Sequence, residues 1–102
     1  MMEPVRNFYK EKRGSLPDVW EAWKYFEDEV VELDEAIDSN HVAKEAADVL
    51  FTLVGYCLTM GIDLDKAFQL VCESNMTKEF TPEGKIQKGS NYVEPDMSSA
   101  IR

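Results

Sequence analysis

Apolar residues recur at helical spacing through the middle of the chain and predict its main elements. One stripe has members three or four positions apart and predicts a helix of about 20 residues; it consists of Trp23, Phe26, Val30, Leu33 and Ile37. The segment from about residue 41 to residue 60 is apolar on almost every side, which is typical of a buried helix. A further stripe predicts another helix that ends near residues 76–79; it consists of Leu64, Ala67, Phe68, Val71 and Cys72.

Capping residues predict where these helices begin and end. Pro17 is expected just inside the first of them, with Ser15 before it. Residues 38–40 are polar, break that helix and are expected to cap the next one. Gly61 is expected to end the second helix, and Asp63 is expected to cap the one that follows.

The two ends of the chain differ from this helical middle. Residues 3–13 predict a short N-terminal helix. Residues 80–102 contain turn-forming segments and no long apolar run, so they predict an ordered loop or short hairpin rather than a further helix. We therefore expect one all-α domain over residues 1–102, with a helical core at about 17–79 and a polar C-terminal tail at 80–102.

The charge balance excludes several classes of protein. The 102 residues contain 11 Lys and Arg against 20 Asp and Glu, which gives a net charge of −9. A general nucleic-acid binder needs a basic surface, so this class is not expected. No run of about 18 apolar residues predicts a membrane span, and no apolar segment near the N-terminus predicts a signal peptide. Cys57 and Cys72 have no metal-site spacing, and we expect both to be buried thiols of a reduced, cytoplasmic protein.

Acidic residues concentrate between residues 27 and 38, where seven of the twelve residues are Asp or Glu. Glu29 and Glu32 lie three positions apart and therefore share one face of their helix. Glu45 and Asp48 have the same spacing, but they lie on the helix that is apolar almost all round. Burying an unpaired carboxylate costs several kcal/mol, so we expect a cation to compensate these charges.

The turn near residues 38–40 can bring the two acidic pairs face to face. The only lysines on the two acidic helices, Lys24 and Lys44, are too few to neutralise the cluster. Four carboxylates without cysteine or paired histidine favour a hard cation, Mg²⁺ or Mn²⁺. A di-iron site is disfavoured because it requires Glu-x-x-His motifs, and His41, the single histidine, does not follow a Glu at that spacing. A solvated acidic face is the simpler alternative, but the helix that carries Glu45 offers no polar face for it.

The carboxylate pairs and the tail together resemble a known family. The order Glu29-x-x-Glu32, twelve further residues and Glu45-x-x-Asp48, all on helices, resembles the MazG-like all-α nucleoside triphosphate pyrophosphohydrolases. Dimeric dUTPases and phosphoribosyl-ATP pyrophosphohydrolases belong to the same superfamily. Its members usually have Glu-Glu-x-x-Glu at the first motif, and here Asp28 holds the leading position. The tail resembles the C-terminal segment of small members, many from phages; the matching stretches are Asn75-Met76-Thr77-Lys78, Gly84-Lys85, Lys88-Gly89-Ser90-Asn91-Tyr92 and Pro95-Asp96.

This resemblance implies an activity, a cofactor and a set of site residues. The implied reaction is hydrolysis of a nucleoside or deoxynucleoside triphosphate to the monophosphate and pyrophosphate, with Mg²⁺, or Mn²⁺ in its place, as cofactor. The implied metal ligands are Glu29, Glu32, Glu45 and Asp48, and either Glu29 or Glu32 would orient the attacking water. The implied substrate contacts are Asn75, Lys78, Lys85, Lys88 and Tyr92. Packing of the tail is the alternative role for Tyr92, and solubility is the alternative for the tail lysines. The enzyme would act in the cytoplasm, or in the host cytoplasm if it is phage-encoded.

A single chain of this length cannot cover the apolar surface of residues 43–58. We therefore expect a homodimer, or a dimer of dimers, in which the central helices of two subunits form a four-helix bundle. Trp23 fits the core stripe, with stacking on a nucleotide base as its alternative role. Two other functions remain open: hydrolysis of phosphoribosyl-ATP in histidine biosynthesis, and a non-catalytic helical interaction module. The base and sugar preference depends on pocket shape and does not follow from the sequence.

Overall fold

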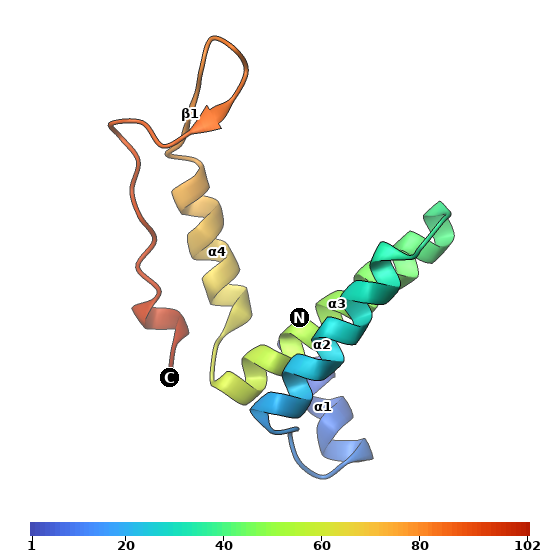
Figure 1. Cartoon of the computed structure of the whole chain (residues 1–102). Helices are drawn as coiled ribbons and strands as arrows, with labels where there is room; N and C mark the ends of the chain where they lie inside the picture. The colour runs from blue at the N-terminus through green and yellow to red at the C-terminus, as the bar shows by residue number, and fades with distance from the viewer. The chain divides into compact units, whose positions relative to one another are not determined.

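The computed structural model describes all residues from Met1 to Arg102 and contains four α-helices, one two-stranded hairpin and one short 3-10 helix (Figure 1). These elements form two compact units, residues 1–62 and residues 63–102, each with its own internal packing. None of the helices combines the length and the apolarity that a membrane span requires. The predicted all-α class, with a short hairpin in the C-terminal tail, is confirmed.

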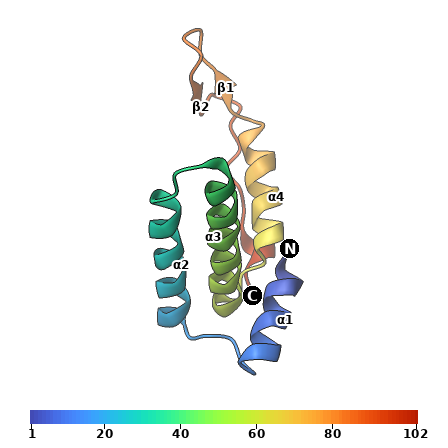
Figure 2. The ribbon, with the colours of Figure 1, turned by 90° about the vertical axis from the view of Figure 1, so that its right-hand side faces the viewer.

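Three helices make up the first unit. They are α1 (Met2–Lys12), α2 (Val19–Asp34) and α3 (Ser39–Met60), and each corresponds to a helix that the sequence predicts. Helix α3 lies between α2 and α1, and α2 and α3 run antiparallel because a short loop joins them (Figure 2). This antiparallel pair carries the predicted carboxylates on its two members.

Aromatic rings and one glycine hold α1 against α3. The ring of Phe8 meets that of Phe51 edge to face, with the centroids 5.1 Å apart. Tyr9 is buried and lies against Gly55, where an added Cβ would come within 3.2 Å of the tyrosine ring and hydroxyl. Gly55 therefore sets how closely α1 approaches α3, because any side chain there would push the ring away.

The first expected helix boundary was wrong, and the next ones were right. Helix α2 begins at Val19, because the carboxylate of Asp18 accepts the backbone N–H of Glu21 at 2.9 Å and so caps the helix. Pro17 therefore lies before the helix rather than inside it. At the other end, Ile37 lies beyond α2 and is 93% exposed. The rest of the stripe is only partly covered, because Trp23 and Val30 are exposed and Phe26 and Leu33 are half-buried.

The caps of the two following helices agree with the prediction. The Asp38 carboxylate accepts the N–H of His41 at 2.8 Å at the start of α3. Gly61 ends α3 with a φ of 72°, the left-handed conformation that favours glycine. The Asp63 carboxylate accepts the N–H of Lys66 at 3.1 Å and caps α4.

The second unit consists of α4 (Leu64–Asn75), the strands β1 (Glu79–Phe80) and β2 (Ile86–Gln87), and η1 (Ser98–Ala100). The strands pair antiparallel, with Phe80 opposite Ile86. The chain then returns along α4, where the Thr77 hydroxyl accepts the N–H of Val93 at 2.9 Å. At the other end of α4, the carbonyl of Ala100 accepts the N–H of Asp63 at 2.8 Å. These two attachments give the tail a defined path.

The expectation that both cysteines are buried was half wrong. Cys57 is buried on α3, whereas Cys72 is exposed on α4. The tail covers the side of α4 that carries Ser74, which is 6% exposed. Cys72 lies two positions earlier, about 200° around the helix axis, and therefore faces away from the tail.

The N-terminal half of α3 is less covered than its apolar composition predicts. Four apolar side chains at positions i, i+3, i+4 and i+7 are exposed; they are Ala43, Ala46, Ala47 and Leu50. Apart from the carboxylate residue Glu45, the first buried side chains lie further along the helix, at Val54 and Cys57. Within one chain, this half of α3 therefore presents an apolar stripe with no partner.

Candidate functional site

Helices α2 and α3 bring three acidic side chains together. Glu29 and Glu32 lie one turn apart on α2, and Glu45 lies on the facing part of α3. Each of the three offers one carboxylate oxygen, and these oxygens all lie within 4.8 Å of one another. Three of the four predicted metal ligands therefore form one group.

Glu45 is the most deeply buried member of this group. The residue is only 4% exposed, and its Oε2 atom has no hydrogen-bond partner. The Oε2 atom of Glu29 is also buried without a partner. Such oxygens lose their hydration and gain nothing in return, so the group as it stands is destabilising unless a cation or a proton neutralises it.

Two basic side chains approach the other oxygen of Glu45. The Lys44 ammonium lies 3.3 Å from Glu45 Oε1, and His41 Nε2 lies 3.5 Å from the same atom. The Lys44 ammonium also lies 2.6 Å from Asp48 Oδ2. These hydrogen bonds with Asp48 and Glu45 raise the pKa of Lys44, so it stays charged over the whole working range of pH.

Crowded negative charge affects the protonation of Glu29. Burial raises the pKa of this carboxyl group above its ordinary value of 4.5. The neighbouring carboxylates raise the pKa further, Glu32 most of all, followed by Asp48 and Glu45. Positive charge delivered to this group would therefore be bound favourably.

Asp48 and Asp28 both lie outside the three-residue group. Asp48 is held by Lys44, so its role as a fourth ligand stays a prediction. Asp28, at the leading position of the first motif, forms an ion pair with Lys24 at 2.9 Å on the exposed side of α2. The ion pair between Lys44 and Asp48 was not predicted, although their spacing of four residues is typical of helical ion pairs.

The tryptophans near the start of α2 differ in their surroundings. The ring of Trp23 packs against those of Phe26 and Tyr56, with centroids 5.4 and 5.3 Å away. Trp23 is nevertheless 42% exposed, and Trp20 is 84% exposed. Trp23 thus belongs to an aromatic cluster at the edge of the first unit rather than to a closed core.

The predicted substrate contacts all lie in the second unit; they are Asn75, Lys78, Lys85, Lys88 and Tyr92. The Lys88 ammonium lies 4.9 Å from the centre of the Tyr92 ring and 3.7 Å from Glu94. The hydroxyl of Tyr92 lies 3.3 Å from that of Ser74 on α4. Tyr92 therefore packs against the tail and α4, and binding of substrate by these residues stays a prediction.

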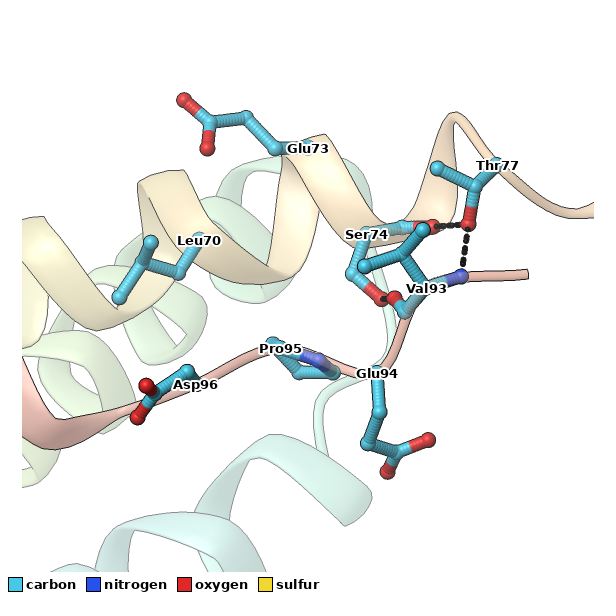
Figure 3. A pocket seen from close by; sticks show the side chains of 8 residues that line it. All are labelled: Leu70, Glu73, Ser74, Thr77, Val93, Glu94, Pro95 and Asp96. Carbon is cyan, nitrogen blue, oxygen red and sulfur yellow. Dashed lines mark hydrogen bonds between the residues drawn. The ribbon is translucent and has the colours of Figure 1, made fainter. Parts of the chain in front are cut away.

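A cavity of about 350 Å³ lies between α4 and the tail (Figure 3). Its eight lining residues are Leu70, Glu73, Ser74, Thr77, Val93, Glu94, Pro95 and Asp96. Three of them are acidic and none is basic, so a triphosphate would be repelled. None of the predicted substrate contacts lines it. This cavity is therefore unsuitable as the nucleotide site.

The comparisons with known proteins identify one family. Its sequence model, described as phosphoribosyl-ATP pyrophosphohydrolase, matches residues 2–75. This range runs from the first residue of α1 to the last residue of α4 and includes every predicted metal ligand. No curated protein and no solved structure matched the chain. The chain belongs to the phosphoribosyl-ATP pyrophosphohydrolase family of the MazG-like superfamily, which points to a nucleotide pyrophosphohydrolase enzyme.

Proposed function

We propose that this protein hydrolyses a nucleoside or deoxynucleoside triphosphate to the monophosphate and pyrophosphate, using Mg²⁺ held by carboxylates of α2 and α3. The observation that carries the proposal is the carboxylate of Glu45. It is 4% exposed, has an oxygen with no hydrogen-bond partner and belongs to a group with two further carboxylates. A structural carboxylate of this kind would be costly, whereas a metal ligand needs such an arrangement.

The side chains of the group fit a hard divalent cation. They supply oxygen atoms alone, the donors that Mg²⁺ and Mn²⁺ prefer, and include no cysteine. Glu29, Glu32 and Glu45 would be ligands, and Asp48 would join them once Lys44 releases it. Mg²⁺ held by these residues would supply positive charge that neutralises the charge developing on the pyrophosphate leaving group.

The carboxylates of α2 would also act on the water nucleophile. Glu29 or Glu32 would accept a hydrogen bond from this water and aim its oxygen at the α-phosphorus. A bond forms between that oxygen and phosphorus, the bond from phosphorus to the bridging oxygen of the β-phosphate breaks, and the proton of the water passes to the Glu carboxylate. Glu32 is the more exposed of the two and is open to water, whereas Glu29 is half-buried.

Residues at the end of α4 and in the tail would supply further contacts to substrate. By resemblance to the family, Asn75 and Lys78 would bind phosphates or the sugar, and Lys85 and Lys88 would neutralise the triphosphate. Tyr92 would hold the tail in shape, a role supported by the 3.3 Å approach of its hydroxyl to Ser74.

We further propose that two chains form a homodimer through their central helices, with a dimer of dimers as a larger form. The exposed stripe of residues 43–50 on α3 supports this, because its three alanines allow close helix contact. Ala46→Glu would place a charge in the stripe and should give a monomer in size-exclusion chromatography with light scattering. Ile37→Glu introduces the same charge at a residue that is 93% exposed, and it should leave the dimer intact. A monomeric wild type would contradict the dimer.

Phosphoribosyl-ATP is the second candidate substrate. The description of the matching family model favours it. The same site would serve, because the attack at the α-phosphorus and the release of pyrophosphate are alike for both substrates.

A substrate panel tests the proposal. The protein would be incubated with each ribonucleoside and deoxynucleoside triphosphate, dUTP and phosphoribosyl-ATP, in Mg²⁺ and then in EDTA, and the products separated. Pyrophosphate released from a triphosphate only in Mg²⁺ is the expected result. Turnover of phosphoribosyl-ATP alone would establish the second candidate. No turnover of any compound would overturn both and favour a non-catalytic interaction module.

A further inference from the structure

Lys44 is the one Lys or Arg of the first unit that contacts the proposed metal ligands, and His41 Nε2 lies 3.5 Å from the same Glu45 oxygen. Its ammonium contacts two of the proposed metal ligands, Glu45 Oε1 at 3.3 Å and Asp48 Oδ2 at 2.6 Å. The other ion pairs of Lys and Arg in this unit lie away from the carboxylate group; they are Arg6 with Glu3, Arg13 with Glu21 and Lys24 with Asp28. The positive charge of the site therefore comes mainly from one lysine.

We propose that Lys44 is an exchanging counter-ion of the carboxylate site: its ammonium competes with the divalent cation for Glu45 and Asp48, and after displacement it binds a phosphate oxygen of the substrate. This inference rests on the proposed function, because it takes the carboxylate group as a metal site. It adds a substrate-binding residue outside the tail, on the same helix as two of the ligands.

Competition follows from the sharing of oxygen atoms. Lys44 holds Asp48 Oδ2 at 2.6 Å, so a metal bound through Asp48 would share this carboxylate with the ammonium. An ammonium and a divalent cation on the same carboxylate repel each other, most strongly beside a buried group such as Glu45. Binding of the metal through Asp48 would therefore weaken this ion pair and favour release of the ammonium.

The lysine is free to move when it is displaced. Its side chain is 65% exposed, and its flexible four-carbon stem allows the ammonium to swing without repacking the core. The backbone of Lys44 keeps the ammonium within reach of the carboxylate group. A metal-bound triphosphate brings several negative oxygens to that group, so the displaced ammonium finds a new partner beside the old one.

Two binding measurements on Lys44→Met test the exchange. Calorimetric titration with Mn²⁺ alone should show binding about tenfold tighter than in the wild type, because the competitor is gone. Titration of the Mn²⁺-saturated protein with inorganic pyrophosphate should show binding about tenfold weaker, because a phosphate partner is gone. Circular dichroism spectra would verify that the variant is folded.

Matched variants separate the exchange from a general effect of charge. Lys24→Met removes the same charge from an exposed i, i+4 ion pair on α2 and should leave both affinities unchanged. Lys44→Arg keeps the charge and should stay near the wild type in both titrations. If Lys44→Met fails to fold, Lys44→Gln gives the same comparison with a side chain that retains hydrogen bonding.

The results of these titrations separate failure of the Lys44 exchange from failure of the proposed function. A Mn²⁺ affinity that is unchanged or weaker in the folded Lys44 variant overturns the exchange, and so does an unchanged pyrophosphate affinity. A wild type that binds no Mn²⁺ at all overturns the proposed function itself. Tighter Mn²⁺ together with weaker pyrophosphate, seen for Lys44 and absent for Lys24, supports the exchange.

Discussion

The carboxylate group of the first unit and the cavity of the second differ in whether their buried polar atoms have hydrogen-bond partners. In the second unit the buried Ser74 donates its hydroxyl hydrogen to the carbonyl of Val93 at 2.7 Å, and Thr77 donates to the carbonyl of Ser74 at the same distance. In the first unit Glu45 is as well buried, yet one of its oxygens has no partner. Hydrogen-bonded groups such as the Ser74 hydroxyl stabilise the fold, whereas the unpartnered oxygen of Glu45 supports the proposed ligand site.

Substitution of Glu45 should produce the largest difference between the two regions. Glu45→Gln keeps the size of the side chain but removes the charge that would hold the metal. We expect turnover to fall by more than about 100-fold, while the helical circular dichroism spectrum stays unchanged. Glu27→Gln, at an exposed acid on α2, is the control and should keep full activity. A fully active Glu45→Gln variant would show that Glu45 is not one of the metal ligands.

Metal binding should stabilise the protein through the first region alone. A ligand at about 100 times its Kd adds about 2.7 kcal/mol to the free energy of unfolding when it binds only the native state. We therefore expect thermal melting in Mg²⁺ to occur at a higher temperature than in EDTA. The shift should vanish in Glu45→Gln and persist in Ser74→Ala. A shift of equal size in all three proteins would mean that the metal binds elsewhere.

Ser74→Ala should destabilise the second unit without changing the carboxylate group of the first unit. The variant loses the hydrogen bond from the buried Ser74 hydroxyl to the Val93 carbonyl, a loss of about 0.5–1.5 kcal/mol in the free energy of unfolding. Denaturant unfolding would measure this loss. Ser99→Ala, at an exposed serine of η1, should be neutral. Equal stability of the two variants would show that the tail does not depend on Ser74.

The smallest expected effect is the pH dependence of Glu29. Because its pKa is raised in the folded protein, the folded state takes up this proton before the unfolded state does as the pH falls. In EDTA the contribution of Glu29 to stability is therefore greatest at acidic pH and declines as the pH rises through the raised pKa. Glu29→Gln lacks this decline, so its stability in EDTA should fall less than that of the wild type between about pH 5 and neutrality. If the stability of the wild type and that of Glu29→Gln changed with pH in parallel, the raised pKa of Glu29 would be contradicted.

Local sequence patterns were sufficient to predict the helices and most residues of the candidate site. The caps at Asp38, Gly61 and Asp63 depend on residues a few positions apart, so the sequence displays them directly. The same holds for the spacing of Glu29 and Glu32, and for that of Glu45 and Asp48. The short loop between α2 and α3 then leaves little choice but an antiparallel arrangement that brings the two pairs together.

Features that depend on distant contacts could not be predicted. The attachment of the tail to α4 joins Ser74 and Thr77 to Val93, more than fifteen positions later. The exposure of Cys72 follows from that attachment, because it decides which side of α4 is covered. Pro17 was misplaced for a different reason: both it and Asp18 suit a helix start, and only the hydrogen bond from Glu21 to Asp18 decides between them.

The missing side chain at Gly55 places the contact with α1 about 15 Å along α3 from Glu45, because the two residues lie ten positions apart on the helix. Helix α1 rests on α3 through the rings of Phe8 and Tyr9, and Arg13 at its C-terminal end pairs with Glu21 of α2 at 2.9 Å. Most changes on α1 therefore leave the facing acids of α2 and α3 undisturbed, while a change at position 55 alters the seat of the whole helix.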